Sequence, residues 1–280
     1  MRTSFLLSSL LLLSTGACGV NRVNRAALVP HMTPTLGNGA PMETSAELML
    51  GASSVAHTTL GATDTTAGVE VPGTQAEGQA RFRVGRHAAI GLIYAEGFAS
   101  TAQAIKPNQP PVDGGDTRGY GFTVSGMVPT ADPRWHVGLN FEGLTWRVPY
   151  VEYSVCVDLC GGVNYSTVDH GVASATQIAV GVVPTYSTER FRAWGGVTLR
   201  NHPTIEQKGV ELGVDFSNDV EDGSFNLVLS AGLDTALGGS GIRGGLTVYQ
   251  VAYGAPASYG PSLAAMVTIP LGGRDPAPAH

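Results

Sequence analysis

Two cysteines in the stretch CVDLC are the residues of this chain best placed to do chemistry. Cys156 and Cys160 can join across a short loop as a disulfide, or they can take part in a metal site. A metal site needs further cysteine or histidine ligands at suitable spacing, and the nearest candidate, His170, stands alone. In an oxidising compartment a disulfide is the favoured outcome. The sequence therefore predicts a disulfide between Cys156 and Cys160 and no metal.

Cys18 follows a segment that is typical of a secretory signal. Arg2 supplies the basic start, and FLLSSLLLLS over residues 5–14 is the apolar core. Residues 14–18, STGAC, resemble a bacterial lipobox, in which cleavage before the cysteine leaves it lipid-modified, although Thr15 stands where leucine is usual. Ordinary cleavage after Ala17 is the alternative. A disulfide uses two of the 3 cysteines, and acylation of Cys18 accounts for the third. We expect no cofactor other than this covalent lipid.

Carboxylates and histidines gather in loops without a catalytic motif. Asp169 and His170 are adjacent, whereas omptin-type proteases of the outer membrane use Asp pairs and an Asp/His dyad with a motif that this chain lacks. Asp113 and Asp116 lie in a different loop. Residues 203–223 are acidic but lack the glycine of a calcium loop. We therefore expect no enzyme activity.

The composition favours strands over membrane helices. The chain has 280 residues with 38 glycines and 14% charged residues, and its mean hydropathy is +0.09. Past residue 18, no apolar run approaches the ~20 residues of a membrane helix. Barrel strands produce this combination because they alternate lipid-facing residues with others. The net charge of −6 argues against nucleic acid as a partner.

Alternation of apolar with polar or small residues, as in RWHVGLNFEG over 134–143, recurs along the chain. It predicts ten strands, and the connections between them are tight turns at one end and mostly long loops at the other. Outer-membrane barrels have this arrangement, with short periplasmic turns and long extracellular loops. The predicted strands are 44–56, 76–86, 88–99, 117–129, 134–148, 172–184, 189–201, 223–236, 241–252 and 259–271.

The two faces of these strands differ in chemistry. If the apolar face contacts lipid, the other face lines a narrow lumen that side chains fill. Fourteen of the 16 basic residues are arginine, whose planar fork binds carboxylates bidentately. We expect a lumen charge network in which arginines pair with carboxylates: Glu47, Arg81, Arg83, Glu142, Arg192, Asp234 and Arg243.

Aromatic residues concentrate near the strand ends, where interfacial belts are expected. Trp135 and Tyr186 flank turns at the proposed periplasmic end. The proposed belt at the other end contains Phe98, Trp146, Tyr150, Tyr253 and Tyr259.

These features together resemble the bacterial outer-membrane β-barrel class over residues 44–271, without the motif of a specific family. The resemblance implies an all-β, antiparallel, up-and-down transmembrane barrel in the Gram-negative cell envelope. Residues 1–18 would be the signal, 19–43 a periplasmic tether and 272–280 a tail. The N-terminus would be periplasmic and the long loops extracellular. The last strand ends TIPL instead of with the aromatic residue usual in this class.

The leading functional expectation is a lipoprotein barrel that acts as a structural or surface-presenting component of an envelope complex for attachment, motility or export. Its partners would be outer-membrane lipid and envelope proteins that dock on the loops or the periplasmic face. One alternative is a narrow, anion-selective, porin-like pore. Another is a soluble periplasmic β-barrel lipoprotein that holds an apolar ligand.

Overall fold

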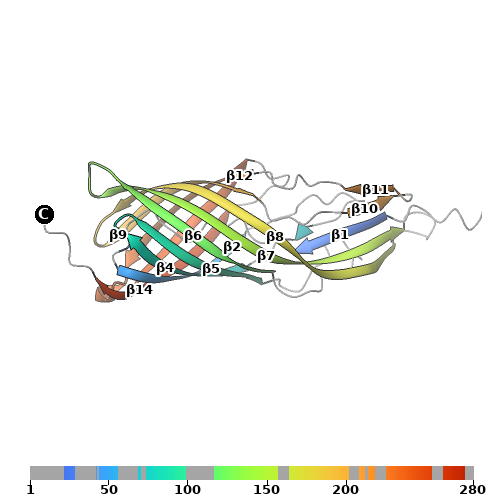
Figure 1. Ribbon diagram of the computed structural model, residues 1–280, viewed down its shortest axis with the longest axis horizontal. Coiled ribbons are helices and arrows are strands. Elements are labelled where there is room, and N and C mark those ends of the chain that lie inside the picture. The colour runs from blue at the N-terminus through green and yellow to red at the C-terminus, as the bar shows by residue number, and fades with distance from the viewer. Residues whose placement is uncertain are drawn as a thin grey trace, which may run out of the picture.

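The structure is a computed structural model, in which ten strands close into one antiparallel barrel (Figure 1). It describes residues 22–28, 42, 44–55, 69–70, 74–98, 117–156, 164–201, 208–211, 214–217, 225–253 and 261–274. Each barrel strand pairs with the barrel strands before and after it in sequence, and β14 pairs with β2 to close the ring. The barrel strands are β2 (Thr44–Val55), β4 (Thr74–Gly85), β5 (Ala88–Phe98), β6 (Thr117–Pro129), β7 (Trp135–Cys156), β8 (Asn164–Ser187), β9 (Phe191–Asn201), β12 (Phe225–Ala236), β13 (Arg243–Tyr253) and β14 (Ser262–Arg274).

The all-β, up-and-down barrel predicted from the alternation is confirmed. Tight connections follow β4, β6, β8 and β12, as expected, and the last of them contains a short 3₁₀ helix, η1 (Gly238–Ser240). In the part of the chain that the structure describes, no helix is long and apolar enough to cross a membrane. Strand β14 runs to Arg274, three residues past the predicted end of the barrel at 271.

The outer face of the barrel is apolar along most strands. Alternate residues point outward, and Leu92 is the most exposed large apolar side chain among them, at 64%. Leu139 and Phe141, from the stretch RWHVGLNFEG, lie on this face. Apolar side chains that face outward around the ring include Phe82, Ile90, Phe122, Val124, Val180, Val197, Leu229, Leu233, Leu246, Val248 and Leu263.

Aromatic residues border this apolar surface. At the turn end, the rings of Trp135 and Tyr186 meet edge to face at 5.3 Å, and Phe191 lies 5.9 Å from Tyr186. Toward the loop end, exposed Tyr94 and Tyr120 are cross-strand partners.

The two aromatic belts are separated by the thickness of a membrane. Tyr120 pairs with Thr145, which is ten residues from Trp135 along β7. Ten residues at ~3.3 Å each, in strands tilted ~40°, give a height of about 25 Å between the belts. Transmembrane barrels have an apolar band of about this height.

Strands β7 and β8 extend well past the predicted limits of 148 and 172–184. They pair from Trp135 with Tyr186 to Cys156 with Asn164, so their hairpin projects beyond the barrel wall (Figure 1). Strand β1 (Arg22–Leu28) pairs with this projection, from Val155 to Tyr150. Short strands β3 (Val69–Glu70), β10 (Lys208–Glu211) and β11 (Val214–Ser217) enlarge the sheet on the β1 side.

Strand β1 lies inside the segment predicted as a periplasmic tether, 19–43, and its position differs from the expectation. Its pairing with β7 puts it at the end of the long loops, opposite the tight turns. The N-terminal strand and the turns are therefore at different ends of the barrel, and not at the same end as the sequence analysis expected.

The side chain of Asn201 continues the barrel wall where β9 stops. Its Nδ2 donates to the carbonyl of Thr176 at 2.9 Å, and its Oδ1 accepts from the amide of Ile178 at 2.5 Å. These two β8 groups lie just past the last β8–β9 pair on that side, Ala179 with Arg200. An asparagine side chain thereby replaces one step of strand pairing.

Candidate functional site

The interior of the barrel carries ion pairs near the tight turns. Nη1 of Arg81 on β4 lies 2.5 Å from Oε1 of Glu47 on β2, and its Nη2 donates to the Ser125 hydroxyl at 3.0 Å. Nε of Arg243 lies 2.6 Å from Oδ1 of Asp234. The alternation of strand residues dictates this placement, because each of these side chains lies on the face opposite the apolar one.

Arg192 and Arg83 also lie on the inner face at this end. Arg192 is buried and is the cross-strand partner of Asp234, on the side away from Arg243. Nη1 of Arg83 reaches the carbonyl of Met42 at 3.5 Å. The seven residues predicted as the lumen network thus all lie on the inner face of the barrel, six buried and Arg83 half-buried.

Arg200 is a further member of the network, which the sequence analysis did not include. Its Nη2 pairs with Oε1 of Glu142 across β8, and both side chains are nearly inaccessible, at 3% and 4% exposure. The signal was present in the sequence. Arg200 has the same parity as Arg192 on β9, so the alternation already placed it on the inner face.

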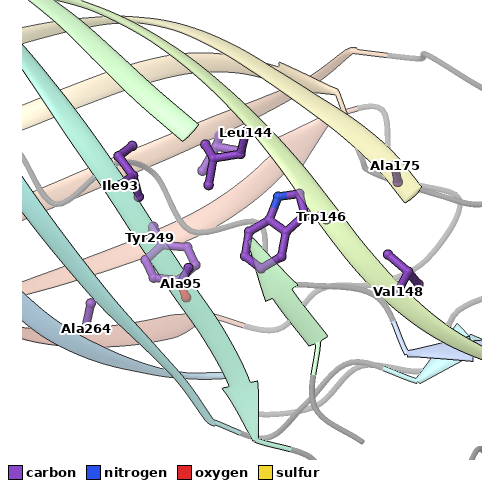
Figure 2. Close-up of a cluster of buried hydrophobic side chains, with 9 residues drawn as sticks. Ile93, Ala95, Leu144, Trp146, Val148, Ala175, Tyr249 and Ala264 are labelled. Atoms are coloured by element: carbon purple, nitrogen blue, oxygen red, sulfur yellow. The ribbon is translucent and has the colours of Figure 1, made fainter. Parts of the chain in front are cut away.

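The loop-end half of the interior contains a cluster of apolar side chains beside buried polar ones such as Gln177 and Asn226. Figure 2 shows Ile93 of β5, Leu144 and Trp146 of β7, and Tyr249 of β13 projecting into the barrel. The Trp146 Nε1 donates to Oε1 of Gln177 at 3.0 Å. Trp146 therefore does not belong to the outer aromatic belt in which the sequence analysis placed it, because its parity with Glu142 turns it inward.

Trp146 fits inside the wall because its neighbour on β6 is a glycine. A methyl group on Gly119 would lie 2.7 Å from Cδ2 of the Trp146 ring. Glycine on the inner face thus leaves room for a large inward side chain.

Asp169 and His170 lie exposed on the projecting part of β8. One Asp169 carboxylate oxygen accepts from the backbone amide of His170 at 2.8 Å. Cys156 is the last residue of β7. Within the described ranges, no group of three or more His, Cys, Asp and Glu side chains is arranged to hold a metal ion. The signal and the predicted sites at Cys18 and Cys160 lie outside the described residues, as do Asp113, Asp116 and most of the acidic segment 203–223.

An apolar exterior around a charged and polar interior is the reverse of a soluble barrel. Burying this apolar surface in hydrocarbon is favourable, and exposing it to water is not. The fold and its interior therefore define a transmembrane β-barrel. They do not fit the alternative of a soluble barrel with an apolar ligand, since Leu139 and Val180 point outward.

Comparison with known proteins gives distant structural likeness. No family model matches the chain, and no curated protein matches it. Among solved structures, the chain is similar to the crystal structure of an outer membrane channel from Pseudomonas putida F1, with 11% sequence identity and a TM-score of 0.42. The likeness covers 85% of this chain and 99% of that one.

Proposed function

We propose that the protein is a non-enzymatic outer-membrane barrel that is filled by its own side chains and displays the projecting β7–β8 sheet. The observation that carries this proposal is the burial of the inner face. Gln177, Asp234 and Thr117 expose at most 1% of their surface, although they line the inside of the wall. A barrel whose lining is covered in this way acts as a rigid mount, and its function lies in what it presents.

The projecting sheet gives this mount something to present. From Thr145, at the level of the loop-end belt, β7 continues for eleven residues to Cys156. At ~3.3 Å per residue this adds about 36 Å of strand beyond the apolar band. With the tight turns in the periplasm, as is general for this class, the sheet stands at the cell surface as a component of an envelope complex.

The position of β1 sets a condition on the proposed lipid. Arg22 pairs with Val155, far from the tight turns, and four residues span at most ~14 Å. A lipid on Cys18 would therefore lie on the side of the long loops, and it could not reach the leaflet at the tight turns. Radiolabelled palmitate should label the wild type and not Cys18→Ser, and the disulfide between Cys156 and Cys160 should appear as resistance to alkylation until reduction.

Planar-bilayer recording tests the proposal. A filled barrel gives no steady single-channel steps in 1 M KCl, a salt concentration chosen to reveal small conductances. Steady openings would contradict the mount. Protease treatment of intact cells is a complementary test. The protease should cut the protein only in the long-loop region.

A narrow anion-selective pore is the second candidate, favoured by the excess of arginine at the turn end. Arg81, Arg83, Arg192 and Arg243 face two carboxylates there, Glu47 and Asp234. Such a ring of cationic side chains selects anions when a path is open. A reversal potential in a KCl gradient that indicates chloride selectivity, and that is reduced in Arg192→Gln, would support this function.

A further inference from the structure

Strand β8 has an open edge in the part of the hairpin that projects from the barrel (Figure 1). It pairs with β7 along almost its whole length, but with β9 only as far as Ala179. The Asn201 side chain bonds the next two backbone groups of β8. In the described part of the chain, no strand continues beside β8 from there to its first residue, Asn164. One side of the projecting strand is therefore paired and the other is open.

The open edge carries backbone hydrogen-bonding groups. Asn201 reaches the carbonyl of Thr176 and the amide of Ile178, so even-numbered residues of β8 direct their N–H and C=O groups to this side. By the same alternation, Val172 and Ser174 direct theirs to the open edge. The register shift between β7 and β8 lies farther out, so this stretch of the strand is regular. A regular row of such groups is a template for the pairing of another strand.

The residue types along this edge leave it accessible to a partner. Proteins commonly block open edges with lysine or proline, and residues 164–177, NYSTVDHGVASATQ, contain neither. Val172 is exposed and lies four residues beyond Thr176, whose partner Thr145 is level with the loop-end belt. This spacing puts Val172 about 10 Å outside the apolar band, so lipid does not cover it. An apolar side chain on a neighbouring strand would cover it instead.

The charge near the open edge favours a basic partner. Asp169 is exposed on β8, and by parity its side chain lies on the opposite face of the strand from Val172. The arginines of β1, Arg22 and Arg25, lie on the far side of β7. Residues 203–223, which include β10 and β11 of the same sheet, contain six acidic residues and one lysine. An acidic surface of this kind attracts a cationic partner before it docks.

From this we propose that the open edge of β8 binds an extended, basic segment of another polypeptide. The segment pairs antiparallel with β8, as β9 does closer to the membrane. It places apolar residues beside Val172 on one face and basic residues beside Asp169 on the other. In such strand addition, main-chain hydrogen bonds give affinity and alternate side chains give specificity. The inference rests on the proposed display of the β7–β8 sheet and names the class of partner that the sheet recognises.

A second copy of the chain does not fit this edge. Two copies in one membrane are related by an axis along the membrane normal, so their β8 strands, each tilted ~40°, would cross at about 80°. Copies in two facing membranes could pair at Val172 only with the membranes about 20 Å apart. This distance is less than the ~28 Å by which each sheet rises above its own membrane.

The test is fluorescence anisotropy with the full chain in a non-ionic detergent and a labelled peptide in which valine and lysine alternate. Peptide valines that lie opposite Val172 direct their N–H groups to β8, and the lysines direct theirs away. N-methylation of the valines should therefore weaken binding at least ~10-fold, because hydrogen bonds to the edge are lost. N-methylation of the lysines is the matched control and should change the affinity less than about twofold.

Variants of the protein place the peptide on β8. Val172→Pro removes one donor from the open edge and leaves the pairing with β7 intact, so it should weaken binding ~10-fold or more. Val172→Thr keeps the donor and should stay within about threefold of the wild type. Asp169→Asn should lower the affinity about two- to fivefold, the size of an exposed ion pair, and reduce its salt dependence. Faster migration of unboiled protein on a cold gel shows that each variant is folded.

The proposal is overturned if the folded wild type does not bind the peptide at millimolar concentration, or if both N-methylated peptides bind equally well. It is also overturned if folded Val172→Pro binds as the wild type does. If Val172→Pro does not fold, the N-methylated peptides decide alone. A dimer in detergent that Val172→Pro separates, as measured by light scattering, would also overturn it, since a second copy would then occupy the edge.

The outcome can be told apart from failure of the proposed function. Peptide binding in detergent does not depend on whether the barrel conducts. Absence of peptide binding together with silence in planar bilayers would reject the docking edge and leave the filled mount in place. Peptide binding together with steady openings would reject the filled mount and support the docking edge.

Discussion

Replacing Leu229 with arginine tests the direction of the apolar face. Leu229 points outward on β12, four residues from Phe225 and six from Thr235, which is the partner of Phe191 in the turn-end belt. At ~3.3 Å per residue and a tilt of ~40°, these separations put Leu229 about 10 Å from one edge of the apolar band and about 15 Å from the other. An arginine near the midplane of a barrel costs about 2–4 kcal/mol, which is roughly 30- to 700-fold in the unfolding equilibrium constant.

The assay is reversible unfolding by guanidinium chloride in phosphatidylcholine vesicles, followed by tryptophan fluorescence. Leu237→Arg is the matched control, because Leu237 is an exposed leucine just after the same strand, in the turn-end connection. It should cost only about 0–1 kcal/mol, as arginine does near the interface. If Leu229→Arg unfolds with the same midpoint as the wild type, the apolar face does not contact hydrocarbon. The same conclusion follows if Leu229→Arg and Leu237→Arg lower the free energy of unfolding equally.

Three further predictions concern single contacts. Arg200→Met leaves the buried Glu142 carboxylate without its guanidinium and should destabilise the barrel by about 3–5 kcal/mol, whereas Arg200→Met with Glu142→Gln should recover part of this loss in the same unfolding assay. Gly119→Ala should cost about 1–3 kcal/mol and shift the Trp146 emission, since the new methyl group meets the ring, while Gly85→Ala, with nothing within 4 Å, should change neither. At the β6–β7 turn, hydrogen bonds from Arg134 lower the pKa of Asp132 below its usual value of about 3.9. The stabilising contact is therefore complete above that pH and is lost as the pH falls through the lower, folded pKa, and an NMR titration of Asp132 should show its midpoint rising in Arg134→Gln.

Much of the barrel follows from the sequence because the signal is local. Each strand alternates apolar and polar residues over ten or more positions, so the faces are set by parity, and all strands except β7 and β8 appear close to their predicted ranges. The same parity places Glu47, Arg81 and Asp234 inside. It also places Arg200 and Trp146 inside, although Trp146 was expected in a belt at the strand end.

The extramembrane part could not be predicted in this way. Past Thr145 the β7–β8 hairpin leaves the lipid, so its outer face no longer needs to be apolar and the alternation fades. Strand β1 joins β7 from more than a hundred residues away in sequence, and nothing in RVNRAAL specifies that partner. Which arginine pairs with which carboxylate likewise depends on cross-strand register, which a pattern of period two leaves open.

The amide group of Asn201 has a consequence for how the strand lengths of such a barrel can vary. It bonds the β8 backbone groups of Thr176 and Ile178 in place of a residue of β9. Strand β9 can therefore end before β8 does, and these β8 groups are still paired. Neighbouring strands can therefore end at different heights around the barrel. Strands can be longer or shorter above the membrane while the hydrogen-bonded ring within the membrane stays closed.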